Sequence, residues 1–156
     1  ASGLTSNAED ETICHGDEVE FSATNQGLTQ YAFFINTDTM QNGPSFQWTT
    51  MELLDQDEVY SIFYDSNGCM GVTESIVMTV NDLPITSLTS SDEDNEICDG
   101  DTVTFMATNQ SLVNYDFMIS GSSAQSSSSF SYTAPNLTNG DAAWVRVTDD
   151  NDCEAN

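Results

Sequence analysis

The chain contains one sequence pattern twice, and this duplication constrains its fold more than any other feature. Comparing residues 4–72 with residues 88–156, an offset of 84, gives 28 identities in 69 positions without a gap. The clearest shared stretch is Ile-Cys-x-Gly-Asp-x-Val-x-Phe, which begins at Ile13 and again at Ile97. Self-similarity at one fixed period is the signature of tandem repeated domains. We therefore expect two copies of one domain, spanning residues 1–83 and 84–156, each the size of a small β-sandwich.

The hydrophobic pattern within each copy predicts short β-strands. Apolar and polar residues alternate, which is the period of a strand with one buried face. The predicted inward-facing sets of copy one are Val19, Phe21 and Ala23; Tyr31, Phe33 and Ile35; and Val59, Ser61 and Phe63. The offset places equivalent sets in copy two. Because no helical period of useful length occurs, the predicted fold class is all-β, with short strands at sandwich-like spacing.

Two segments are expected to depart from this regular pattern. Residues 37–45, which become a serine-rich stretch at 121–129, are predicted to form an exposed loop or edge, because such sequence cannot pack a core. Residues 72–80 are predicted to form one closing strand with Ile76, Met78 and Val80 inward. The offset places the counterpart of that strand beyond Asn156, so copy two is expected to have an open sheet edge.

The charge balance excludes several classes of partner. The chain has 26 Asp and Glu residues against one Lys or Arg, a formal net charge of −25. Nucleic acid and anionic membrane surfaces both require basic residues, so neither is expected as a partner, and no segment is apolar enough to predict membrane insertion. Two explanations for the carboxylates stay open. They could confer solubility in a salty medium that screens self-repulsion, or they could bind hard divalent cations such as Ca²⁺.

A calcium site is predicted, under the second explanation, near the junction of the two copies. Its candidate oxygen ligands are Asp65, Asn67, Asp82, Asp92, Glu93 and Asp94. The chain has no twelve-residue loop of the EF-hand type, and these acidic residues have no fixed spacing. In this interpretation no cofactor is required, and calcium is an optional one.

The four cysteines occupy matching positions, two in each copy: Cys14, Cys69, Cys98 and Cys153. Four cysteines allow three connectivities, and only Cys14–Cys69 with Cys98–Cys153 keeps each copy self-contained. We therefore expect one disulfide inside each domain, stabilising it by about 3–4 kcal/mol in the chain-entropy model. Zinc is less favoured because no Cys-x-x-Cys pair is present. Disulfides indicate an oxidising compartment, and hence an extracellular location.

The combined motifs of the repeat resemble a known family. They are Ile-Cys-x-Gly-Asp-x-Val-x-Phe, then Tyr-x-Phe-x-Ile, then Asp-x-Asn-(Gly/Asp)-Cys. Over nearly its whole length the chain is similar to the Ig-like tandem repeats of large secreted cell-surface proteins of Bacteroidetes, including gliding-motility adhesins. The resemblance implies two tandem Ig-like antiparallel sandwiches in a surface adhesin or fibre. One departure is that Phe33 and Phe117 stand where antibody-like domains carry a core tryptophan.

Residues suited to catalysis are scarce. His15 is the only histidine, Asp99 replaces it in copy two, and the chain has no lysine. The chain therefore has almost no residue that could act as the general base of a Ser-His-Asp type of triad. Carboxylate pairs are abundant, but domains of this size use their interiors for their own cores, which leaves no evident pocket for a glycosidase. No catalytic residue is predicted, and the chain is not expected to be an enzyme.

The outward faces of two strands carry unusually many apolar side chains. If the strands after Gln30 and after Asp57 are neighbours, then Phe34, Tyr60, Ile62 and Tyr64 form one outer patch, with Met118 and Trp144 as weaker counterparts. Such a patch is typical of a contact surface, although cover by a side loop would also explain it. Separate candidate glycosylation sites are Thr39, Asn109 and Asn136.

Three functions are carried forward from the sequence. The first is a non-catalytic structural or adhesive module, whose partners are other repeats, neighbouring fibre subunits, or a surface glycan or protein. The second is a fibre subunit that polymerises by strand exchange at the open edge of repeat two. The third is an accessory carbohydrate-binding domain, which would need an aromatic platform.

Overall fold

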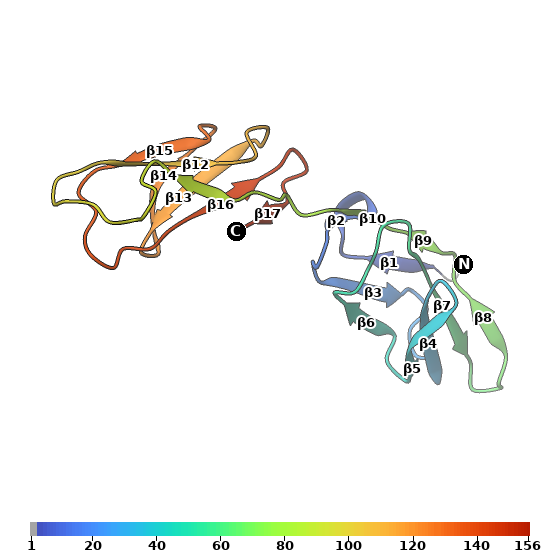
Figure 1. Ribbon diagram of the computed structural model, residues 1–156. Helices are drawn as coiled ribbons and strands as arrows, with labels where there is room; N and C mark the ends of the chain where they lie inside the picture. Colours follow the sequence, from blue (N-terminus) through green and yellow to red (C-terminus); the bar gives the residue numbers. More distant parts are fainter. Residues whose placement is uncertain (1–2) are drawn as a thin grey trace. The chain divides into compact units, whose positions relative to one another are not determined.

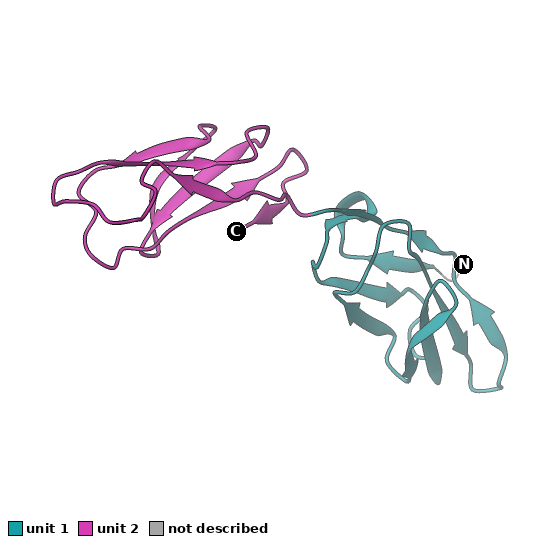
Figure 2. Cartoon of the chain, in the orientation of Figure 1, with its two compact units in different colours: residues 1–82 teal, residues 83–156 magenta. Residues whose placement is uncertain are grey.

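The computed structural model describes residues 3–156, which form short β-strands joined by turns and irregular segments (Figure 1). The chain divides into two compact units, Ala1–Asp82 and Leu83–Asn156 (Figure 2). The one helical segment among the described residues is a 3-10 turn at Glu9–Glu11. None of the described helices is long and apolar enough to span a bilayer.

Unit 1 contains two antiparallel sheets that pack on each other. The first has the order β1-β3-β6, formed by Leu4–Ser6, Val19–Ala23 and Gln47–Thr50. The second has the order β5-β4-β7-β8, formed by Asp38–Gly43, Gln30–Ile35, Glu58–Tyr64 and Met70–Val72. This division of the strands matches the A, B and E strands and the C′, C, F and G strands of an immunoglobulin-like sandwich.

The closing segment of unit 1 is interrupted, which corrects the single strand predicted over residues 72–80. β9 (Ile76–Val77) pairs with β7, and β10 (Thr79–Asn81) then pairs in parallel with β2 (Thr12–Cys14). The ladder along β7 is also interrupted before β9, at Thr73, which is buried and exchanges hydrogen bonds with the backbone of Ser61 through its own N–H and hydroxyl.

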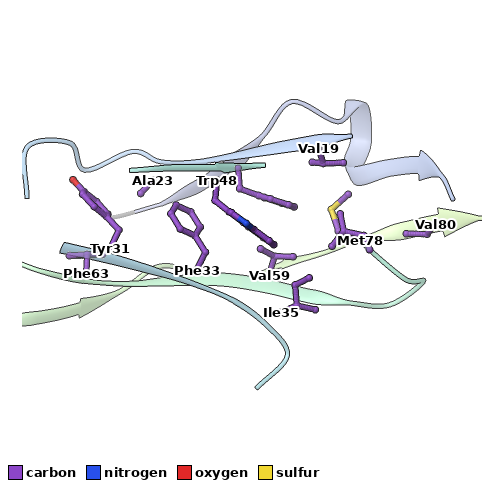
Figure 3. Close-up of a cluster of buried hydrophobic side chains, with 12 residues drawn as sticks. Val19, Ala23, Tyr31, Phe33, Ile35, Trp48, Val59, Phe63, Met78 and Val80 are labelled. Carbon is purple, nitrogen blue, oxygen red and sulfur yellow. The ribbon is translucent and has the colours of Figure 1, made fainter. Parts of the chain in front are cut away.

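The core of unit 1 lies between its two sheets and consists of the predicted inward-facing side chains. All nine residues of those three sets are buried. Figure 3 shows Tyr31, Ala23 and Phe63 at one end of this core and Val19, Met78 and Val80 at the other, with Phe33 and Trp48 between them.

Unit 2 repeats this architecture without the closing segment. Its first sheet has the order β11-β12-β15, formed by Leu88–Ser90, Val103–Ala107 and Ser131–Ala134. Its second has the order β14-β13-β16-β17, formed by Ser122–Ser127, Asn114–Ile119, Ala143–Thr148 and Glu154–Ala155. Its core is smaller, with Ala107, Tyr115, Phe117, Val145 and Val147 at the centre.

Of the two alternatives predicted for residues 37–45, a loop or an edge, the structure has an edge strand in both copies. β5 pairs along β4, and the serine-rich β14 pairs along β13. Both hairpins turn at a residue with positive φ, Asn36 in one unit and Ser120 in the other. A ladder uses backbone hydrogen bonds, so an edge strand forms even where its own side chains are small and polar.

Candidate functional site

The predicted outer patch forms on one face of the β4–β7 pair in unit 1. Phe34 lies opposite Tyr60, Ala32 opposite Ile62, and Gln30 opposite Tyr64 in the antiparallel register. The rings of Phe34 and Tyr60 are stacked, with centroids 5.0 Å apart and planes 4° from parallel. Phe34, Tyr60, Ile62 and Tyr64 are half-buried, so part of each side chain is available to a partner. We call these four residues the outer patch.

The same face of unit 2 is partly polar. Met118 lies opposite Trp144, as Phe34 lies opposite Tyr60, but Met118 is buried and Trp144 is half-buried. At the next paired position, Asp116 and Arg146 replace Ala32 and Ile62 and form an ion pair, with Nη2 2.6 Å from Oδ2. This is the chain's one Arg or Lys, and its guanidinium is used inside unit 2.

Asp116 is held ionised by its neighbours. A hydrogen bond from the Ser123 hydroxyl, and then one from Arg146, keep the pKa of Asp116 below its ordinary value against the opposing effect of burial. This ion pair was not predicted from the sequence. The substitution of Ala32 and Ile62 by one acidic and one basic residue at the repeat offset is the signal that could have found it.

An open groove lies in unit 2 where unit 1 has its closing segment. Its volume is about 870 Å³. One wall is the stretch from Glu96 to Asp99, the other is the loop from Leu137 to Asp141, and Val103 and Phe105 lie between them. An open edge was predicted here, but a groove lined by these residues was not.

The predicted disulfide pairing is wrong. Cys69 and Cys98 are exposed free thiols, whereas Cys14 and Cys153 are disulfide-bonded. The reason lies in the length of the sandwich. Cys14 is beside Asn81 at one end of unit 1, and Cys69 follows Tyr64 at the other end of β7. A strand of seven residues spans about 20 Å, and a disulfide requires Cα atoms within about 7 Å.

The same separation applies in unit 2. Cys98 lines the groove together with Ala143, at the start of β16, whereas Cys153 follows Thr148 at its end. The repeat in the sequence therefore showed which cysteines are equivalent. It did not show where each cysteine lies along its strand.

The candidate calcium ligands do not form one cluster. Within residues 3–156, no group of three or more His, Cys, Asp or Glu side chains is arranged to hold a metal ion. Asp65 instead closes the turn after β7, because its Oδ1 accepts the N–H groups of Asn67 and Cys69, each at 2.8 Å. The hydrogen bond from Cys69 is the main cause that lowers the pKa of Asp65.

The other calcium candidates have separate places. Asp82 is exposed at the last position of unit 1, and Glu93 and Asp94 are exposed in the bend after β11. Asp92 is half-buried and lines the groove. Calcium binding therefore stays a prediction.

The remaining candidate positions lie at the surface. His15 and Thr39 are exposed, Thr39 on β5 rather than in a loop. Asn136 is exposed in a turn with φ of 58°. Asn109 is half-buried and its side chain is engaged, since Nδ2 donates to Ile85 and Oδ1 accepts from Ser111. Glycosylation of these sites stays a prediction.

Comparison with known proteins gives only distant likenesses. No protein-family model matches the chain, and no curated protein matches it. Among solved structures, it is similar to fibronectin(III)-like modules of Clostridium thermocellum CbhA, with 12% identity, a TM-score of 0.49, and coverage of 98% of this chain and 89% of that one.

Two animal proteins are similar at the same level. The human OSCAR ligand-binding domain has 11% identity, a TM-score of 0.43, and coverage of 99% and 94% of the two chains. Murine CEACAM1b has 11% identity, a TM-score of 0.39, and coverage of 94% and 92%. These likenesses are too distant to bear on function, so the functional argument rests on the residues themselves.

Proposed function

We propose that the chain is a non-catalytic structural and adhesive module of an extracellular fibre or cell-surface adhesin. One observation carries the proposal: the equivalent strands β4 and β13 share their inward-facing residues and differ on their outward faces. Tyr31 and Phe33 have identical, buried counterparts in Tyr115 and Phe117. The outer face of β4–β7 is aromatic, whereas the outer face of β13–β16 carries an ion pair. Selection on such a molecule acts on packing inside and on contacts outside.

The distribution of titratable groups supports a non-catalytic role. The single histidine is exposed, and the three carboxylates with lowered pKa values, those of Asp65, Asp116 and Asp141, each owe the shift first to a hydrogen bond within their own turn or strand pair. A catalytic acid or base needs a pKa raised or lowered toward the working pH, and these shifts move away from neutrality.

The extracellular location and the organism group belong to this proposal. The disulfide-bonded state of Cys14 and Cys153 fits an oxidising compartment. The resemblance of the repeat motifs to Bacteroidetes surface proteins suggests the kind of cell. No cofactor is required by a role of this kind.

The test is an adhesion assay on the outer patch. Beads carrying the chain are applied to surfaces coated with extracellular-matrix proteins and to a glycan array. We expect the wild type to adhere to at least one surface, and the variant Tyr60→Glu/Tyr64→Glu to lose most of that adhesion. Thr49→Glu, at an exposed position of β6, is the matched control and should adhere like the wild type. Equal adhesion by the outer-patch variant would contradict the proposal.

The glycan array in that assay distinguishes a glycan partner from a protein partner. Binding to glycans that depends on the outer patch would support an accessory carbohydrate-binding module, for which aromatic faces form the platform. Binding to proteins alone would support the adhesin.

A further inference from the structure

We propose that the outer patch is the centre of a larger face of unit 1, and that this face binds a protein whose own surface is apolar in the middle and carries Arg or Lys opposite Glu58. The inference rests on the proposed function, because it names the chemistry of the partner that the outer patch would contact. It adds three exposed residues to that site and gives a role to one carboxylate.

The apolar surface continues from the outer patch onto the strands beside β7. The added residues are Met70 and Val72 of β8 and Val77 of β9, whose exposed fractions are 62%, 48% and 52%. Their antiparallel partners on β7 are Tyr64, Ile62 and Glu58, in that order. Residues directly opposite each other lie on the same side of a sheet, so the three side chains share the outward face. We call them, together with the outer patch, the extended face.

Unit 2 builds the same sheet without this apolar surface. At the repeat offset, Met70 becomes Glu154 and Tyr64 becomes Thr148, and the two replacements are paired in the same antiparallel register. The fold therefore does not require apolar side chains at these positions. Exposed apolar surface that the fold does not require is typical of an interaction site.

The two tyrosines of the extended face have unpaired hydroxyl groups. In the core, the Tyr31 hydroxyl donates to the Asn25 carbonyl at 2.7 Å and accepts from the Leu28 N–H at 3.1 Å. The hydroxyls of Tyr60 and Tyr64 make no hydrogen bond within the described residues. Each of these side chains therefore offers a partner an apolar ring and a polar end, the combination that enriches tyrosine at interfaces.

The geometry of the extended face favours a protein over a glycan. The rings of Phe34 and Tyr60 stack on each other with planes 4° from parallel, so one face of each ring is already covered. Less ring surface is therefore left for a sugar to stack on. The exposed residues around them, Met70 among them, are flexible or branched apolar side chains. Aromatic residues and methionine are the types enriched at the centres of protein interfaces.

A carboxylate at the border of the extended face specifies the charge of the partner. Glu58 is exposed on this face, opposite Val77, and its carboxylate makes no hydrogen bond or ion pair within residues 3–156. The chain's one Arg or Lys is Arg146, so unit 1 has none of its own. A guanidinium or ammonium group of the partner would form a charge-assisted hydrogen bond with Glu58.

The same charge argues against a second copy of the chain as the occupant. Two extended faces in contact would place Glu58 against a surface that has acidic residues and no Arg or Lys. Like charges brought together at an interface weaken association, and a net charge of −25 keeps the molecules apart. A partner with basic residues around an apolar centre has the complementary charge.

The test selects binders from a phage-displayed library of small folded domains with randomised surface residues, using the whole chain at an ionic strength of about 0.15 M. The library is first depleted on Met70→Glu/Val72→Asn, which gives unit 1 the residues that unit 2 has at 154 and 156. This variant is more acidic than the wild type, so depletion also removes binders that recognise negative charge alone. We expect the remaining binders to combine apolar side chains with Arg or Lys.

Calorimetry then measures the Kd of the remaining binders for three variants. Met70→Glu/Val72→Asn should raise Kd at least about tenfold, because it changes the centre of the interface. Glu58→Gln removes one charge and keeps the shape, and it should raise Kd about two- to fivefold. Met51→Glu is the matched control. Met51 is 58% exposed directly after β6, in the other sheet, so this variant should bind like the wild type.

The inference is overturned if no binder remains after depletion, if the remaining binders have no excess of Arg and Lys over the starting library, or if Glu58→Gln leaves their Kd unchanged. Adhesion to glycans alone would also overturn it. These failures differ from a failure of the proposed function, which is equal adhesion by Tyr60→Glu/Tyr64→Glu. Lost adhesion by that variant, together with binders free of basic residues, would keep the adhesive role and refute the basic partner.

Discussion

At the residue scale, the cysteines show that disulfide pairing depends on where each cysteine lies along its strand. Both cysteines of a unit flank the same sandwich, but they lie at its two ends. Equivalence between repeats is visible in the sequence, whereas the distance between two cysteines depends on strand register, which is set by packing and turns.

This arrangement predicts the number of reactive thiols. Alkylation of the native, unreduced chain with iodoacetamide should label two cysteines, Cys69 and Cys98, because both are exposed thiols. Labelling after reduction and denaturation should reach all four. Peptide mapping by mass spectrometry identifies the labelled sites. A native chain with no labelled cysteine would contradict this prediction and support one disulfide within each domain.

The Asp116–Arg146 pair predicts a second residue-scale result. Arg146→Ile leaves Asp116, whose side chain is 7% exposed, without its counter-charge, and should lower the free energy of unfolding of unit 2 by about 1–3 kcal/mol. The double variant Asp116→Ala/Arg146→Ile reproduces the Ala32 and Ile62 of unit 1. Its free energy of unfolding should lie within about 1 kcal/mol of the wild-type value, since replacing a whole ion pair by apolar residues is often neutral.

Urea denaturation monitored by tryptophan fluorescence measures both variants of that pair, with Trp144 reporting on unit 2 and Trp48 on unit 1. If the double variant were no more stable than Arg146→Ile alone, the loss would come from Arg146 packing and not from the unpaired carboxylate.

At the element scale, the strands were predictable where one face is buried, and less so elsewhere. The alternation of Val19, Phe21 and Ala23 predicted β3 and its inward face, because burial imposes a period of two. For the edge strands β5 and β14, the sequence left a loop and an edge as alternatives, since their side chains are polar and no buried face imposes a period of two. The groove could be anticipated as an open edge, but its lining required the register of β2 and β10.

One strand pair depends on the absence of a side chain. Gly71 lies opposite Phe63, and a Cβ at Gly71 would come within 2.3 Å of the Phe63 ring. At the equivalent paired position, unit 2 has Val147 opposite Ala155. Gly71→Ala should therefore destabilise unit 1 by about 1–3 kcal/mol through overpacking, and Phe63→Val by about 2–3 kcal/mol through a cavity.

The double variant Phe63→Val/Gly71→Ala should be less destabilised than the sum of the two single variants by at least about 1 kcal/mol, because the methyl group then fills the space that the ring vacated. Gly43→Ala is the control, as nothing lies near its added Cβ. Strict additivity in thermal or urea unfolding would mean that the ring moves away and that the close approach has no energetic role.

At the scale of the whole molecule, the charge is the dominant property. With 26 acidic residues and one basic residue, each unit repels itself, and salt should stabilise the chain by screening. Raising NaCl from about 10 mM to about 150 mM should increase Tm by about 4–8 °C, equivalent to about 1 kcal/mol.

Specific calcium binding by the acidic residues is a separate prediction from this screening. Differential scanning calorimetry in 150 mM NaCl, with calcium or with a chelator, tests it, and equal Tm values would contradict a specific calcium site. A higher Tm in calcium alone would establish a specific site and would make the acidic residues functional ligands.

The central claim is that the chain is a non-catalytic adhesive module whose contact surface is the outer patch. Its most direct measurement is the adhesion assay that compares the wild type with Tyr60→Glu/Tyr64→Glu and with the control Thr49→Glu. We predict that the outer-patch variant loses most of the adhesion and that Thr49→Glu keeps it. Equal adhesion by the wild type and the outer-patch variant would contradict the claim.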